Sequence, residues 1–106
     1  MNDTNIVEKI DVEINEVIED KLDEPRKYKV IFFNDDATPM EWVIGILNGI
    51  FRHSLESAEK LTVQIHTEGT ATVGIYTYEV AEQKAVEATT ASRERGYPLQ
   101  IKVEEE

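Results

Sequence analysis

The spacing of hydrophobic positions changes along the chain, and each spacing predicts a different element. Residues 28–33 form a β-branched and aromatic run, which predicts a first strand. Residues 34–39 are rich in turn formers and predict a loop. Over residues 40–52 the spacing is that of one helix face, which predicts a helix. Its apolar positions are Met40, Val43, Ile44, Leu47, Ile50 and Phe51.

A second helix is predicted to begin after Ser54, which is a favourable N-cap residue, and to stop at Gly69. Its apolar positions are Leu55, Ala58, Leu61 and Ile65. Residues 70–76 then alternate between apolar and other residues, as a half-buried strand does. Its apolar face is expected to comprise Ala71, Val73 and Ile75.

Thr77 is placed to cap a third helix, which Gly96 should end. That helix presents a stripe of small residues suited to close packing on a sheet, namely Ala81, Ala85, Ala88 and Ser92. Pro98 opens a last strand with one apolar face, formed by Leu99, Ile101 and Val103. Residues 104–106 are expected to be a solvated end.

The predicted order is β-α-α-β-α-β, which indicates an α+β fold of two layers. We expect a small three-stranded antiparallel sheet covered on one face by three helices. The chain has 106 residues, which corresponds to one domain.

Charge divides this chain into two parts. Residues 1–24 carry nine acidic residues and two lysines and lack aromatic residues and glycine, so we interpret them as a flexible acidic tail. Pro25 marks the boundary, and residues 25–106 form the folded core. The net charge of −11 argues against binding to nucleic acid or to an anionic membrane surface.

The absence of cysteine excludes disulfides and thiolate metal sites, and it fits a reducing compartment. The first residues show no apolar segment of the secretory-signal type. We therefore expect a cytoplasmic protein.

Candidate chemistry concentrates in the loop 34–39. Asn34, Asp35 and Asp36 are ordinary turn residues, and Thr38 followed by Pro39 resembles an N-cap with proline at the first helical position. The same carboxylate and amide oxygens would also suit a cation with several donors, such as an ammonium group.

His66, at the end of the second helix, is compatible with a helix C-terminus. With Asp35 and Asp36 it could also form a metal site, although this is a weak ligand pattern. His53 is expected at the surface. Hydrolysis using Ser54 or Ser57 is conceivable, but no nucleophile-elbow glycines surround either serine, so no enzymatic activity is expected.

Two longer strings resemble the ClpS family of adaptors for the ATP-dependent Clp protease. They are Asn34-Asp35-Asp36-Ala37-Thr38-Pro39-Met40 and Thr77-Tyr78-Glu79-Val80-Ala81-Glu82-Gln83-Lys84. The likeness covers residues 26–103. It implies a fold similar to the C-terminal domain of a ribosomal stalk protein and a monomer without a cofactor or metal.

The resemblance implies binding of proteins whose first residue is bulky and hydrophobic and whose α-amino group is free. Asn34, Asp35 and His66 match the family positions that hold the ammonium group, and Asp36 would add negative charge nearby. The implied side-chain pocket comprises Phe32, Thr38, Met40, Val43, Thr62, Ile65 and Leu99.

Delivery is implied to use Glu79 and Lys84, which match the face that docks the N-terminal domain of a ClpA-type or ClpC-type unfoldase. A solvated face is the alternative for these two residues. Thr62 departs from the methionine usual in the family, so the accepted first residues are open. A ribosomal-stalk-like interaction module and a metal-binding domain remain as alternative functions.

Overall fold

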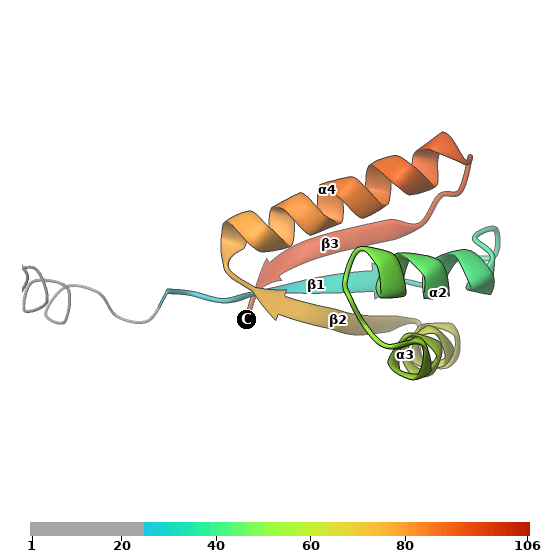
Figure 1. Ribbon diagram of the computed structural model, residues 1–106, viewed down its shortest axis with the longest axis horizontal. Coiled ribbons are helices and arrows are strands. Elements are labelled where there is room, and N and C mark those ends of the chain that lie inside the picture. Colours follow the sequence, from blue (N-terminus) through green and yellow to red (C-terminus); the bar gives the residue numbers. More distant parts are fainter. Residues whose placement is uncertain (1–24) are drawn as a thin grey trace, which may run out of the picture.

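The computed structural model describes residues 25–106, so the interpretation of residues 1–24 as an acidic tail lies outside the described part. The predicted order of elements is confirmed (Figure 1). The elements are β1 (Tyr28–Phe33), α2 (Met40–Gly49), α3 (Leu55–Glu68), β2 (Thr70–Tyr76), α4 (Tyr78–Glu94) and β3 (Gln100–Glu105).

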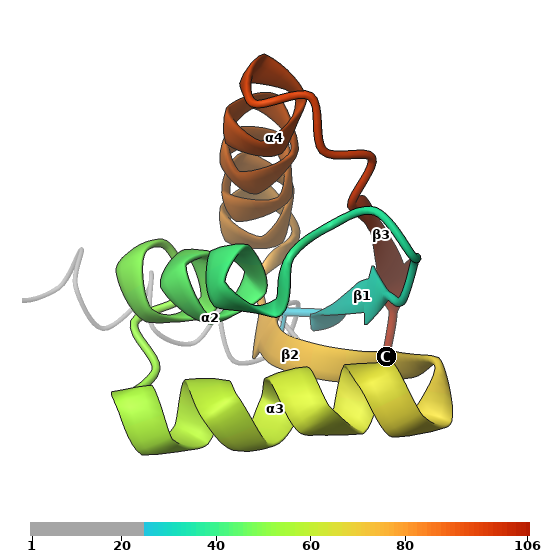
Figure 2. The same ribbon diagram turned by 90° about the vertical axis from the view of Figure 1, so that its right-hand side faces the viewer.

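The sheet is antiparallel with the order β2-β1-β3, so β1 is central. Figure 2 shows α4 beside β3 and α3 along the β2 side, with α2 between these two helices. Val30 and Phe32 of β1 are fully buried in a core to which Leu47 of α2 and Ala81 of α4 also contribute. The α+β architecture expected from the sequence is therefore confirmed.

A β-bulge changes the predicted face of β2. Val30 pairs with Gly74 and Ile31 with Thr72, which leaves Val73 between two paired positions. A one-residue shift moves the following side chains to the opposite face. Ile75 is 46% exposed, so its predicted place beside Ala71 and Val73 is wrong. Tyr76 packs against the core instead of Ile75.

The N-caps of the helices agree only in part with those predicted from the sequence. The Ser54 hydroxyl accepts a hydrogen bond from the Ser57 N–H at 3.1 Å, as predicted for the cap of α3. Thr77 occupies the N-cap position of α4 without a side-chain cap bond. Pro39, not Thr38, is the N-cap of α2, so the predicted Thr38 cap is wrong. The Thr38 hydroxyl donates to Asp35 instead.

The stripe of small residues on α4 is confirmed, because Ala81, Ala85, Ala88 and Ser92 are all buried. The absence of large side chains at these positions allows the helix to approach the sheet closely. At 17 residues α4 is also the longest helix of the described part.

Within residues 25–106, no helix combines the length and the apolar character needed to cross a membrane.

Candidate functional site

The loop between β1 and α2 is organised around the carboxylate of Asp35. Its Oδ1 accepts hydrogen bonds from the backbone N–H of Ala37 at 2.8 Å and of Thr38 at 2.7 Å. Its Oδ2 accepts a bond from the Thr38 hydroxyl at 2.8 Å. The backbone N–H of Asn34 donates to the carbonyl of Gly69 at 2.8 Å, which ties the loop to the end of α3.

These bonds keep Asp35 ionised. Partial burial alone would raise the pKa of the Asp35 carboxyl group. The bonds from the Thr38 hydroxyl and from the Ala37 and Thr38 N–H groups outweigh this effect, with a further contribution from the positive charge of Arg93. The pKa of Asp35 therefore lies below its ordinary value, and the loop carries a negative charge at neutral pH.

A hollow with about 20 Å³ of free space lies beside this loop. It is enclosed by the end of β1, the loop, helices α2 and α3, and Leu99, which precedes β3. Its lining is Phe33, Asn34, Asp35, Thr38, Met40, Val43, Thr62, Ile65, His66 and Leu99. The structure thus brings together all the predicted amine-binding and pocket residues except Phe32, while Asp36 is exposed and lies outside the lining.

Phe32 does not line the hollow because it faces the core. Its side chain is fully buried and makes an edge-to-face contact with Phe51, at 5.4 Å between ring centroids. Successive residues of a strand point to opposite faces, so the next residue, Phe33, is the one that lines the hollow. Phe33 was not among the predicted lining residues, although this alternation could have indicated it.

Polar and apolar groups are separated within the hollow. Asn34 and His66 are exposed on its rim, whereas Val43, Ile65 and Leu99 are buried in its wall. Thr62 is also buried, at 3% exposure, and its hydroxyl donates to the Ala58 carbonyl at 2.8 Å. That internal bond satisfies the polar atom of Thr62 within its own helix.

The metal alternative gains no support from this geometry. Among residues 25–106, no group of three or more His, Asp or Glu residues is arranged to hold a metal ion. Asp35, Asp36 and His66 therefore do not form a common set of ligands.

His53 and Ser57 form a hydrogen-bonded pair away from the hollow. Nε2 of His53 donates to the Val73 carbonyl at 2.6 Å, which leaves Nδ1 to accept from the Ser57 hydroxyl at 3.2 Å. The expected surface position of His53 is wrong, since the ring is half-buried and joins the start of α3 to the bulge in β2. With its Nε2 proton held by a backbone carbonyl, this histidine has a structural role.

Glu79 and Lys84 differ in their surroundings. Glu79 is exposed in the first turn of α4. Lys84 is half-buried, and its ammonium group donates to the Ile50 carbonyl at 2.9 Å while lying 5.9 Å from the centroid of the Phe51 ring. Lys84 therefore caps the C-terminal end of α2 and is not simply part of a solvated face.

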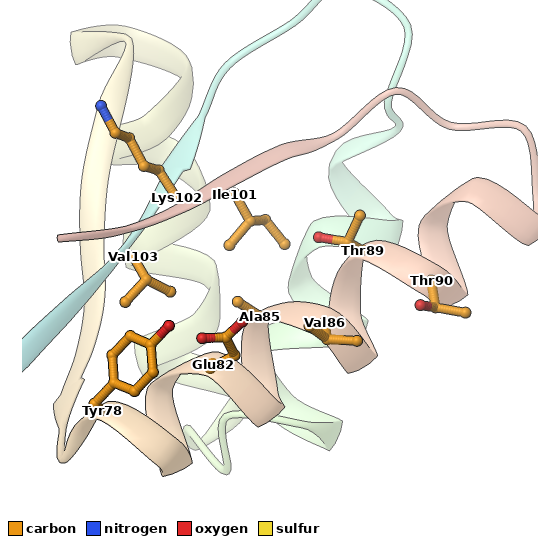
Figure 3. A pocket seen from close by; sticks show the side chains of 9 residues that line it. All are labelled: Tyr78, Glu82, Ala85, Val86, Thr89, Thr90, Ile101, Lys102 and Val103. Atoms are coloured by element: carbon orange, nitrogen blue, oxygen red, sulfur yellow. The ribbon is translucent and has the colours of Figure 1, made fainter.

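A larger groove of about 470 Å³ runs between α4 and β3 (Figure 3). None of the predicted site residues lines it. Near one end, the Tyr78 hydroxyl faces the Glu82 carboxylate. Hydrogen bonding to Glu82 and its negative charge raise the pKa of Tyr78.

The fold and the hollow together define an α+β binding domain with apolar walls and an acceptor-bearing rim. The family model for the ATP-dependent Clp protease adaptor protein ClpS matches residues 23–102. The chain belongs to this family, whose description is that of an adaptor and not of a protease.

Individual relatives agree with this assignment. The ClpS adapter of Treponema denticola is 46% identical over 88 residues, covering 83% of this chain and 87% of the relative. The ClpS adapter of Campylobacter jejuni subsp. jejuni is 48% identical over 86 residues, covering 81% of this chain and 90% of the relative. A solved structure of Agrobacterium tumefaciens ClpS2 bound to L-phenylalaninamide has a TM-score of 0.76 and 38% identity, covering 78% of this chain and all of that one.

Proposed function

We propose that this protein binds substrates through a bulky hydrophobic first residue with a free α-amino group and delivers them to a Clp protease. The observation that carries this proposal is the position of Asn34, Asp35 and His66 beside an apolar wall. Family membership supports it, as does the L-phenylalaninamide bound to the Agrobacterium relative, because that ligand has a free amine next to a benzyl group.

Recognition of the amine follows from the donor and acceptor inventory. An α-ammonium group offers three N–H donors, which the Asn34 amide oxygen, the Asp35 carboxylate and a neutral His66 nitrogen can accept. The hydrogen bonds that Asp35 already receives keep it in place and charged, so the ammonium group would meet a preorganised anion.

Recognition of the side chain requires the hollow to widen. Its free space of about 20 Å³ is sufficient for a water molecule but not for a leucine or phenylalanine side chain. Met40 is 44% exposed and unbranched, so its rotation is the simplest way to open the wall.

Both parts of the ligand are needed for useful affinity. Burial of the side chain would contribute about 1.5–3 kcal/mol. A micromolar complex requires about 8 kcal/mol, so contacts with the amine and the backbone must supply the remainder.

Delivery would use a second surface. In this proposal Glu79 contacts the N-terminal domain of a ClpA-type or ClpC-type unfoldase, and Lys84 contributes both to that contact and to the end of α2. Residues 1–24 would act as the handle that enters the unfoldase pore. The adaptor would work as a monomer in the cytoplasm, where it meets the protease.

Three alanine variants test the proposed site. Fluorescence anisotropy with a Phe-initiated peptide should show weaker binding by Asp35→Ala and His66→Ala. Asp36→Ala is the matched control, because that carboxylate lies outside the lining, and it should bind nearly as the parent does. Circular dichroism should show all three folded. Parent-like binding by both Asp35→Ala and His66→Ala would refute the assignment of the rim.

A divalent-metal titration separates the proposal from the metal alternative. Binding of the Phe-initiated peptide should be the same with EDTA and with added Zn²⁺ or Mg²⁺. Strict metal dependence would favour the alternative.

A further inference from the structure

The connection between α4 and β3 carries one wall residue of the hollow, Leu99, and the side chain of Arg93 bonds two carbonyls of this connection. Arg93 lies in the last turn of α4. Its Nη1 donates to the carbonyl of Tyr97 at 3.0 Å and to that of Leu99 at 2.8 Å. Because one guanidinium nitrogen holds both carbonyls, the backbone before β3 is fixed relative to the helix.

Leu99 is 1% exposed and lines the hollow. It follows Pro98, whose nitrogen has no proton to donate, so the backbone here has fewer hydrogen bonds of its own. The bonds from Arg93 therefore matter for the position of the Leu99 side chain as well as for its carbonyl.

Arg93 is an exposed side chain. Within residues 25–106, no carboxylate oxygen lies within ion-pair distance of the Arg93 guanidinium nitrogen atoms. Its positive charge is one of the influences that lower the pKa of Asp35. The hydrogen bonds of Arg93 are with the connection that carries Leu99, so the apolar wall is the part of the hollow that it positions.

A neighbouring contact joins the same connection to α2. The indole N–H of Trp42 donates to the Ser92 hydroxyl at 2.9 Å, and its ring meets that of Tyr97 edge-on, at 5.4 Å between centroids. In the sequence, Trp42 lies between Met40 and Val43, which also line the hollow. Trp42 therefore joins the helix that carries these two residues to the end of α4 and to the connection that carries Leu99.

We infer that Arg93 is a positioning residue of the binding site, which holds Leu99 in the wall. This inference rests on the proposed function for its consequence in binding, but the position of Leu99 can be measured without a ligand.

Three variants test this role of Arg93. Arg93→Ala removes both the donor and the charge, Arg93→Gln keeps a donor and removes the charge, and Arg93→Lys keeps the charge with a single ammonium group. Arg95→Ala is the matched control, because it removes an arginine from the same helix end. Arg95 lies over the Trp42 ring at 5.2 Å and makes no bond to the Leu99 carbonyl.

The first experiment is NMR on the ligand-free protein. The Leu99 methyl resonances should shift strongly in Arg93→Ala and only slightly in Arg95→Ala. Unchanged Leu99 resonances in Arg93→Ala would overturn the inference.

The second experiment is binding of the Phe-initiated peptide. Loss of charge-assisted hydrogen bonds of this kind predicts that Arg93→Ala weakens binding by about tenfold. The conservative variants should recover part of this loss. A parent that fails to bind the peptide would refute the proposed function, whereas parent-like binding by Arg93→Ala would refute the role of Arg93 in it.

Discussion

Thr38 donates two hydrogen bonds to Asp35, one from its backbone N–H at 2.7 Å and one from its hydroxyl at 2.8 Å. The two bonds end on different carboxylate oxygens. Because Oδ1 also accepts a bond from the Ala37 N–H, Oδ2 is the oxygen that keeps a lone pair for a ligand. Thr38 therefore positions the anion on which the proposed recognition of an ammonium group depends.

Thr38→Val should reduce the stability of the fold at neutral pH and weaken its dependence on pH. The folded-state pKa of Asp35 is lowered, so its contribution is present above the unfolded value of about 3.9 and is lost as pH falls through the folded pKa. Without the Thr38 hydroxyl this pKa rises toward its unfolded value. Urea unfolding of both proteins between about pH 2.5 and 7 checks this.

Equal loss of stability by Thr38→Val at every pH would contradict that account, since a pure packing defect does not depend on ionisation. Thr67→Val is the control, because it makes the same replacement of threonine by valine at another position. Its hydroxyl donates only to backbone carbonyls of its own helix.

Thr62→Met should make the hollow more selective. Thr62 is buried in the lining, where a longer side chain would occupy space that a β-branched ligand needs. We expect weaker binding of Ile- and Val-initiated peptides relative to Leu- and Phe-initiated ones, by about 1–3 kcal/mol. Anisotropy with the four peptides measures this, and an unchanged Leu/Ile affinity ratio would show that Thr62 does not limit the pocket.

Lys84→Ala should destabilise the domain, whereas Glu79→Ala should not. Lys84 donates to the Ile50 carbonyl and lies over two aromatic rings, so its loss should cost about 1–3 kcal/mol. Urea denaturation gives this difference directly. Glu79 is exposed, so its variant isolates the proposed docking role.

Degradation of a Phe-initiated reporter by a Clp protease then tests docking. Glu79→Ala should slow delivery while peptide binding and stability stay at the parent level. Normal delivery by that variant would remove Glu79 from the docking surface.

Deletion of residues 1–24 should leave peptide binding intact and abolish delivery. All lining residues of the hollow lie between Phe33 and Leu99, whereas transfer to a pore requires a handle. Anisotropy and reporter degradation with the full-length and truncated adaptors measure the two steps separately. Full delivery by the truncated adaptor would contradict the role proposed for this segment.

The local parts of this fold could be predicted from the sequence, because they depend on spacing and on single residues. The stripe from Ala81 to Ser92 follows helical periodicity, and the stops at Gly69 and Gly96 follow from the positive φ angles of 93° and 81° that glycine accepts.

The errors arose where a distant partner decides the outcome. The bulge opposite Val30 depends on pairing between two strands. It turns Ile75 to the exposed face and lets Tyr76 pack against the core. Lys84 meets the end of α2, 34 residues earlier in the chain. The role of Arg93 could not be predicted from the sequence, because the carbonyls of Tyr97 and Leu99 come within its reach only once the chain between α4 and β3 is folded.

The most direct test of the central claim compares one Phe-initiated peptide with its N-acetylated form. Acetylation removes the positive charge and two of the three N–H donors, which would leave the acceptors around Asp35 facing an apolar cap. We predict that the parent protein binds the free peptide and that acetylation costs about 2–5 kcal/mol, as expected for the loss of a desolvated charge pair. Equal affinity for the two peptides would contradict the account.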